Sequence, residues 1–312
     1  MRASRLPLLL ALCALPWSGV ARAQLPEPSF ITTSDGVRLA YRRMGSGRPL
    51  LVLHGGPGLG MGSLIADLAP LARDHELVFF DQRGAGHSEP GDTAAATFER
   101  HVQDVDDVVQ RLALERVVVL GHSWGAALAA LYAAAHPERV AGVVLMAPLF
   151  PRLQPWGATA AGRMRPDTAL DRRIASYAAR MANGPDPLAA CREQAPLVLQ
   201  RMVAPGAGRS AADLCDMPAA TLRTRNVITR RTMVSLGAWD LRARAGAYRG
   251  PALVIHGVSD PLPEEAAREW GSVYRDGRVL VVKDAAHMPH VSAPDTVFAA
   301  IRALAAQATA RP

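Results

Sequence analysis

Three side chains of this sequence have the types and the chain order needed for nucleophilic attack on a carbonyl group. Ser123 lies between two glycines in the pentapeptide GHSWG at positions 121–125, and Asp260 and His287 follow, each just after an apolar run. A serine hydroxyl is a poor nucleophile at neutral pH, so it needs a base to take its proton and an acid to orient that base. We interpret Ser123 as the nucleophile, His287 as the base and Asp260 as the acid.

An attacking serine also needs hydrogen-bond donors for the oxyanion that forms at the carbonyl. One donor is expected to be the backbone N–H of Trp124, which directly follows the serine. The second is expected from the run HGGPG at positions 54–58, because glycine allows the backbone to approach a substrate closely. We assign this donor to Gly56, with Gly55 as the alternative.

Two alternatives remain for the acid and the base. His290 lies three residues beyond His287 and is the alternative base, and Asp260 can instead cap a turn before Pro261. The apolar run that ends at Met146 is followed by APLFP, which contains no acid. We interpret the other polar residues near the motifs as structural, holding loops or strand ends; these are His54, Asp81, Arg83, Gly84, His122 and His256.

The elements that must position these residues alternate between strands and helices. Short apolar runs predict strands over residues 31–33, 37–43, 49–53, 77–80, 116–120, 140–146, 252–255 and 279–282. Helical spacing of apolar residues predicts helices over residues 98–112, 124–135, 264–273 and 294–305. Such alternation is typical of an α/β fold, with a mostly parallel central sheet and helices on both faces.

The alternation stops between residues 151 and 248, where Ala- and Arg-rich helical stretches are broken by glycine and proline. We therefore expect a helical cap over residues 151–248, inserted into a core made of residues 24–150 and 249–312. Ligands bind at the carboxyl ends of the strands in an open parallel sheet. The candidate catalytic residues all follow predicted strands, so they are expected to meet at that edge.

The first residues of the chain are typical of a secretory signal peptide. An apolar run over residues 6–20 follows two arginines, and Ala21-Arg22-Ala23 fits a small-x-small cleavage site. We expect residues 1–23 to be removed, and the mature protein to be periplasmic or secreted without a stable membrane anchor. Cys13 raises a lipoprotein alternative, but Leu12 before it is bulkier than such a cleavage site normally accepts.

The charge distribution argues against nucleic-acid binding. The formal net charge of the 312 residues is +7, and three of the positive charges are arginines of the leader. The remaining arginines are scattered and form no patch with interleaved aromatic residues. We also find no metal-ligand spacing and no phosphate-binding loop, so neither a metal nor another cofactor is expected. The expected partner is a small molecule or a short peptide, and the oligomeric state stays open.

Two cysteines remain after the predicted cleavage, Cys191 and Cys215. In an oxidising compartment they can form a disulfide that closes a loop of about 25 residues. The alternative is two buried free thiols, and the sequence does not decide between them.

Five ordered motifs resemble the signatures of the α/β-hydrolase fold family: HGGPG at 54–58, DQRGAGHS at 81–88, GHSWG at 121–125, the Asp260 segment and DAAHMPH at 284–290. The first three together are similar to the proline iminopeptidase group of that family. This resemblance implies a serine hydrolase that cleaves an N-terminal residue, typically proline. It also implies acidic groups in the cap that hold the free amine of the substrate.

On that resemblance, Glu193, the only glutamate of the cap, and Asp240 are the candidates for binding the amine. Trp239-Asp240 stands where such enzymes tend to show Trp-Glu. Trp156 and Trp239 are candidates for lining the pocket, with burial inside the cap as the alternative. An esterase would need only an apolar pocket and is the second interpretation, after the aminopeptidase. A ligand-binding protein with a vestigial triad is the third.

Overall fold

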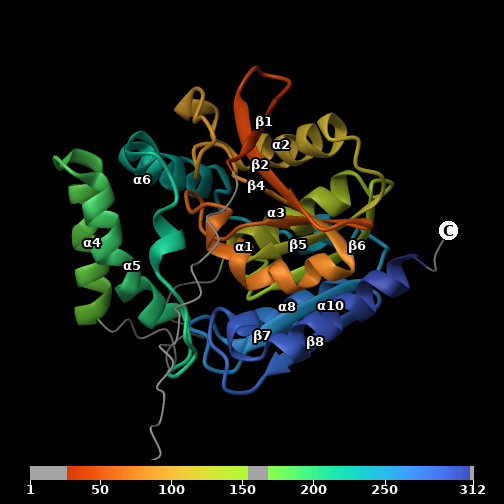
Figure 1. Cartoon of the computed structure of the whole chain (residues 1–312). Coiled ribbons are helices and arrows are strands. Elements are labelled where there is room, and N and C mark those ends of the chain that lie inside the picture. The colour runs from red at the N-terminus through yellow and green to blue at the C-terminus, as the bar shows by residue number, and fades with distance from the viewer. Residues whose placement is uncertain (1–26, 154–167, 310–312) are drawn as a thin grey trace, which may run out of the picture.

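The computed structural model in Figure 1 describes residues 27–153 and 168–309. These residues contain a sheet of eight strands: β1 (Ser29–Thr32), β2 (Arg38–Met44), β3 (Arg48–Leu53), β4 (His75–Phe80), β5 (Val117–His122), β6 (Val140–Met146), β7 (Ala252–Gly257) and β8 (Gly277–Val282). The expected leader, residues 1–23, and Trp156 lie outside the described residues.

The strands follow the order β1-β2-β4-β3-β5-β6-β7-β8. The pairs β1–β2 and β2–β4 are antiparallel, and every other neighbouring pair is parallel, so the predicted mostly parallel sheet is confirmed. All residues of β5 and β6 are buried, as expected for parallel strands covered on both faces. Strand β3 lies between β4 and β5, so the chain order reverses there, and a crevice forms at such a switch point.

Helices cover both faces of the sheet: α1 (Gly62–Leu68), α2 (Phe98–Arg111), α3 (Trp124–Ala135), α8 (Glu264–Val273), α9 (Pro289–Ser292) and α10 (Pro294–Thr309). Alternate residues of a strand point to opposite faces. In β3, Leu51 and Leu53 pack in one core with residues of α2, α3 and α8, whereas Leu50 and Val52 pack in the other with residues of α1 and α10. The helices predicted on both faces are therefore confirmed.

Between β6 and β7 the chain forms a helical region, and Figure 1 shows its main helices to one side of the sheet. The described part consists of α4 (Thr168–Asn183), α5 (Pro187–Met202), the 3-10 helix η3 (Ala212–Cys215), α6 (Ala219–Ser235) and α7 (Arg242–Ala245). Helix α5 begins with Pro187 at its first position. Asp186 precedes it as the N-cap, and its side chain accepts a hydrogen bond from the Ala189 N–H at 2.9 Å.

Helix α6 lies over the loops that follow β3 and β4. The Thr229 hydroxyl donates a hydrogen bond to the carbonyl of Pro57, and a Cβ added at Gly84 would come within 2.7 Å of the Ile228 side chain. The helical region therefore covers the carboxyl ends of these strands, which is where the sequence places the glycine-rich motif.

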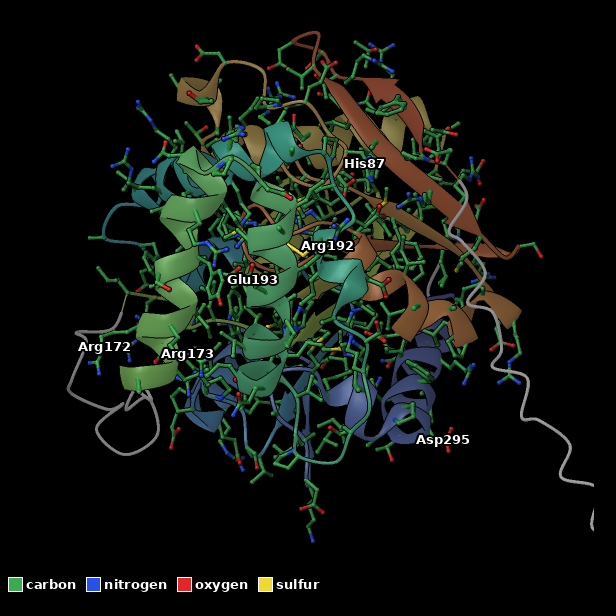
Figure 2. All side chains as sticks on the ribbon, turned by 60° about the vertical axis from the view of Figure 1, so that its left-hand side comes forward. His87, Arg172, Arg173, Arg192, Glu193 and Asp295 are labelled. Carbon is green, nitrogen blue, oxygen red and sulfur yellow. A yellow bond between two sulfur atoms is a disulfide. The ribbon has the colours of Figure 1, made fainter. Side chains whose placement is uncertain are left out.

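Cys191 and Cys215 form a disulfide, with Cα atoms 6.0 Å apart, so the alternative of two free thiols is wrong. The bond joins α5 to η3, and sulfur is drawn in yellow in Figure 2. Helix η3 in turn packs against α1, because a Cβ at Gly62 would come within 2.9 Å of the Asp213 carbonyl oxygen. Within the described ranges, no helix is long and apolar enough to cross a membrane.

Candidate active site

Ser123 occupies a tight turn between β5 and α3. Its φ is 56° and its ψ is −117°, a conformation that residues with a side chain rarely adopt, and its N–H donates to the Met146 carbonyl at 2.8 Å. A Cβ added at Gly121 would lie 2.0 Å from the Gly125 carbonyl oxygen, and one at Gly125 would lie 2.4 Å from the Leu53 carbonyl oxygen. Both glycines of the motif are therefore needed for the strand and the helix to meet at this serine.

Asp260 and His287 come together from the ends of β7 and β8. The His287 Nδ1 lies 3.0 and 2.9 Å from the two carboxylate oxygens of Asp260, and both residues are buried. A carboxylate accepts the Nδ1 proton, which leaves Nε2 of the ring free to accept a proton from a nucleophile. The approach requires Gly257, because a Cβ there would lie 2.3 Å from the carbonyl oxygens of Ala285 and Ala286.

His122 connects the strand end before the serine to the backbone of His287. Its Nε2 donates to the His287 carbonyl at 2.8 Å, and the two rings lie 5.0 Å apart. Burial lowers the pKa of His122 well below its ordinary value, so the ring stays neutral. His290, the alternative base, instead places its Nε2 3.7 Å from a carboxylate oxygen of Asp67. The structure therefore brings His287, and not His290, to Asp260.

Gln82, which the sequence analysis did not single out, links the glycine-rich loop to the residue after the serine. Its side-chain amide donates to the His54 carbonyl at 2.8 Å and accepts from the Trp124 indole N–H at 2.8 Å. Its backbone N–H donates to the His54 Nε2 at 3.0 Å, so the proton of that ring lies on Nδ1, which donates to the Gly55 carbonyl at 3.0 Å. Burial lowers the pKa of His54 to about 4, which keeps the ring neutral. The feature of the sequence that could have pointed to Gln82 is its position in the motif DQRGAGHS, between Asp81 and Arg83.

The two candidate oxyanion donors belong to segments that meet at Ser123. Trp124 is the first residue of α3, where a backbone N–H has no intrahelical acceptor. The glycine-rich loop lies directly against the serine, since a Cβ at Gly55 would come within 3.1 Å of the Ser123 Cβ. Gly56 follows with a φ of 47°. The assignment of the second donor to Gly56, with Gly55 as the alternative, stays a prediction.

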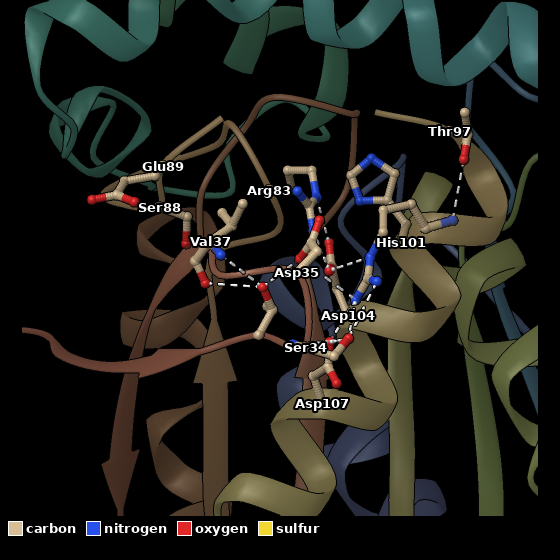
Figure 3. A network of polar contacts seen from close by, with 12 residues as sticks. Ser34, Asp35, Val37, Arg83, Ser88, Glu89, Thr97, His101, Asp104 and Asp107 are labelled. Carbon is tan, nitrogen blue, oxygen red and sulfur yellow. Dashed lines mark hydrogen bonds and ion pairs between the residues drawn. The ribbon is translucent and has the colours of Figure 1, made fainter. Parts of the chain in front are cut away.

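A buried network of ion pairs holds the loop after β4, as Figure 3 shows for Arg83 and its partners. The fully buried Arg83 side chain donates to both oxygens of Asp104 in α2, at 3.0 and 2.7 Å, and to Asp35 at 2.9 Å. Arg100 also binds Asp104 at 3.0 Å and Asp107 at 2.5 Å. The network ties the turn after β1, the loop and α2 together, in agreement with the structural role that we expected of Arg83.

Asp81 has a similar structural role on the other side of this loop. Its carboxylate accepts from the backbone N–H of Met61 at 2.6 Å and of His87 at 2.8 Å. Burial raises the pKa of Asp81 to about 6. A Cβ at Gly86 would lie 2.1 Å from the carboxylate carbon of Asp81, so the loop closes tightly around this acid.

The two acids expected to bind a substrate amine are both paired with arginines of the protein. Glu193, labelled on α5 in Figure 2, is exposed and accepts from Arg180 at 2.7 Å. Asp240 is half exposed and accepts from Arg242 at 2.5 Å. Trp239 packs against the core, and its indole N–H lies 3.4 Å from the Phe150 carbonyl oxygen. The structure records no contact between these three side chains and the Ser123 site within residues 27–153 and 168–309, and their role in substrate binding stays a prediction.

The arrangement is suited to acyl transfer, because it combines a hydroxyl in a strained turn, an imidazole oriented by a buried carboxylate, and a backbone N–H at the start of the helix that follows the serine. In the described part of the chain, no group of three His, Cys, Asp or Glu side chains is placed to hold a metal ion.

Comparison with known proteins supports this interpretation. A family model described as alpha/beta hydrolase fold matches residues 48–294. A proline iminopeptidase of Heyndrickxia coagulans is 39% identical over 123 residues, which cover 38% of this chain and 42% of that protein. The aligned region thus spans less than half of this curated relative.

Solved structures extend the similarity over almost the whole chain. The proline iminopeptidase of Mycobacterium smegmatis superposes with a TM-score of 0.70 and 24% identity, covering 91% of this chain and 100% of that protein. A thermophilic esterase from Thermogutta terrifontis gives a TM-score of 0.66 and 22% identity, covering 90% of this chain and 99% of the esterase. At such identities these two structures show a common fold alone.

Proposed function

The chain belongs to the alpha/beta hydrolase fold family, and from that premise we propose that it is a serine hydrolase that works through Ser123, His287 and Asp260. The observation that carries the proposal is the buried Asp260–His287 pair at 2.9 Å, formed at the same edge of the sheet as a serine held at positive φ. A structural serine at the start of a helix would need neither the strained turn nor the two glycines around it.

In the proposed reaction the Ser123 Oγ attacks the carbonyl carbon while the His287 Nε2 takes its proton. The oxyanion accepts hydrogen bonds from the backbone N–H groups of Gly56 and Trp124. The bond to the leaving group then breaks, and His287 gives its proton to that group. A water molecule activated by His287 hydrolyses the acyl-enzyme, and Asp260 stabilises the imidazolium in both halves.

For the substrate, we place aminopeptidase action of the proline iminopeptidase type first. The support is the similarity to proline iminopeptidases, such as that of Heyndrickxia coagulans, which is 39% identical over 123 residues. Esterase action is the second candidate, and one observation favours it: the carboxylates of Glu193 and Asp240 are already paired with Arg180 and Arg242. A substrate amine would have to compete with these arginines.

We also propose that the mature protein works in the periplasm or outside the cell. The predicted leader over residues 1–23 and the Cys191–Cys215 disulfide support this, because disulfides persist in oxidising compartments. The mass of the protein recovered from a periplasmic extract tests the proposal, since removal of the leader gives a chain that begins at Gln24. Full-length protein in the cytosolic fraction alone would contradict it.

The serine chemistry is tested by labelling with a fluorophosphonate probe. We expect the mature protein to be labelled, and Ser123→Ala to lose both labelling and turnover while it unfolds like the unchanged protein. Ser272→Ala, which removes a serine hydroxyl on the exposed side of α8, is the matched control and should keep both. Full turnover by Ser123→Ala would refute the assignment of the nucleophile.

Two substrates then separate the candidate activities. Faster cleavage of a prolyl arylamide than of a short-chain nitrophenyl ester, lost when the prolyl amine is acylated, would establish an aminopeptidase. Turnover of the ester alone would establish an esterase. A protein that neither cleaves these compounds nor reacts with the probe would instead fit the ligand-binding interpretation.

A further inference from the structure

Arg225 lies on the face of α6 that is directed at the core. Thr221, Ile228 and Thr232 are buried, and Arg225 shares their side of the helix, because residues four, seven and eleven positions after Thr221 return to one face. Arg225 itself is partly buried, in contrast to the exposed Arg230 of the same helix. The guanidinium is therefore carried on the inner surface of the helical region.

The stem of Arg225 packs on the glycine-rich loop beside the candidate nucleophile. A Cβ added at Gly58 would lie 2.5 Å from the Arg225 Cγ, and it would lie 3.1 Å from the Thr229 hydroxyl on the next turn. The same loop meets the serine at Gly55, whose added Cβ would lie 3.1 Å from that of Ser123. Arg225 thus covers the loop that carries the proposed oxyanion donor.

The guanidinium has a neutral partner and no recorded acidic one among the described residues. Its Nη2 donates to the Gln194 side-chain oxygen at 3.3 Å, and the Gln194 amide is fixed because it donates to the Ile174 carbonyl at 2.8 Å. The other partly buried arginines of helical region α4–α6 each have a carboxylate: Arg201 pairs with Asp171 at 3.4 Å and Arg209 with Asp67 at 2.6 Å.

An arginine in this position is costly to the free protein. Burial lowers the pKa of Arg225, because the charged form loses water without gaining an opposite charge. A guanidinium has five N–H donors in a planar fork that matches a carboxylate. Only one of its nitrogens has a recorded partner here, so the geometry leaves donors available for a ligand at the loop.

We propose that Arg225 is the anion-binding residue of this site, and that the substrate carries a carboxylate close to the carbonyl that is cleaved. The proposal rests on the proposed serine hydrolase function and adds the substrate class to it. Short peptides with a free carboxylate and half-esters of dicarboxylic acids both have this chemistry. A charge-assisted pair of this kind corresponds to about 10- to 100-fold in kcat/KM.

The test compares esters that differ in one carboxylate. One pair carries the charge on the acyl side, the mono-nitrophenyl ester of adipate and nitrophenyl hexanoate. The other carries it on the leaving group, 4-carboxyphenyl butyrate and its methyl ester. We expect the charged member of at least one pair to be preferred about 10-fold or more, mainly through a lower KM.

Variants of α6 assign the preference to Arg225. Arg225→Met should abolish the preference for the charged ester, whereas Arg225→Lys should retain part of it. Arg230→Met removes the same charge from the exposed side of α6 and should change nothing. Equal use of charged and neutral esters by the unchanged protein would overturn the proposal while the serine hydrolase stands.

A binding measurement separates this proposal from the proposed function. Monomethyl adipate is titrated calorimetrically into Ser123→Ala, which cannot turn it over. Saturable binding that Arg225→Met weakens at least 10-fold supports the subsite whether or not the protein is a hydrolase. Equal binding by Ser123→Ala and by the double variant Ser123→Ala/Arg225→Met, or no binding by either, overturns the proposed subsite. If the fluorophosphonate probe does not label the unchanged protein, only the proposed hydrolase function is overturned.

Discussion

Replacement of Gln82 by methionine tests how the two walls of the oxyanion site are held together. The Gln82 amide is 1% exposed and bridges the His54 carbonyl and the Trp124 indole N–H, each at 2.8 Å. Methionine has a similar length but neither donates nor accepts a strong hydrogen bond. The variant therefore leaves one buried acceptor and one buried donor without their recorded partner.

The magnitude follows from these two groups. A buried polar group that loses its partner costs about 1–3 kcal/mol, so Gln82→Met should lower the free energy of unfolding by about 2–6 kcal/mol. That is a large share of the roughly 5–15 kcal/mol that stabilises a typical domain. The glycine-rich loop and Trp124 should also separate slightly. Complete loss of one oxyanion donor costs about 100- to 1000-fold in kcat, which sets the upper limit of the effect on turnover.

Urea denaturation and ester hydrolysis measure the two effects, and Gln307→Met is the control. Gln307 is a partly exposed glutamine on α10 that binds Arg278, so its loss should change the free energy of unfolding by less than about 0.5 kcal/mol. Trp124→Phe removes the indole N–H. The double variant of Trp124→Phe and Gln82→Met should lose at least about 1 kcal/mol less free energy of unfolding than the two single variants lose together. A coupling near zero, or a Gln82→Met protein as stable as the control, would refute the reasoning.

Three further predictions concern the fold. Gly121→Ala places a Cβ 2.0 Å from the Gly125 carbonyl oxygen, so thermal denaturation should show a loss of about 3 kcal/mol or more; unchanged stability would contradict the close contact. Replacing both Cys191 and Cys215 by serine should cost about 2–4 kcal/mol in urea unfolding, and a reductant should then destabilise only the unchanged protein. Burial lowers the pKa of His101 to about 3, so the folded state excludes a proton that the unfolded chain binds below about pH 6.5. Stability should therefore fall as pH falls, and between pH 7 and 5 His101→Gln should lose about 2 kcal/mol less than the unchanged protein; equal losses would contradict this.

The sequence by itself determined most elements of the core. The helix predicted over residues 124–135 and the strand predicted over residues 140–146 have these bounds in the structure. The strands predicted over residues 31–33 and 37–43 correspond to β1 and β2, which pair in the antiparallel sense. These predictions depend on local periodicity and on glycine and proline at the ends of elements, which a single stretch of chain contains. The order of strands and helices then predicted the parallel sheet.

The sequence also predicted that Ser123, Asp260 and His287 lie at one edge of the sheet, because each follows a strand and the carboxyl ends of parallel strands share an edge. It could not choose between His287 and His290 by spacing alone. The choice depends on Gly257, whose missing side chain allows the backbone at Ala285 to approach within contact distance of β7. Such a contact joins segments that pack only when the sheet has formed.

Only the tertiary structure decided the partners of the polar side chains. The disulfide of Cys191 with Cys215 and the bridge formed by Gln82 both depend on distances between separate segments, which no local pattern contains. The same holds for Glu193, which pairs with Arg180 from another helix, and for Arg225, whose charge has no recorded acidic partner among the described residues. Apolar periodicity determines which face of an element is buried. The role of a charged side chain depends instead on which groups the folded chain places next to it.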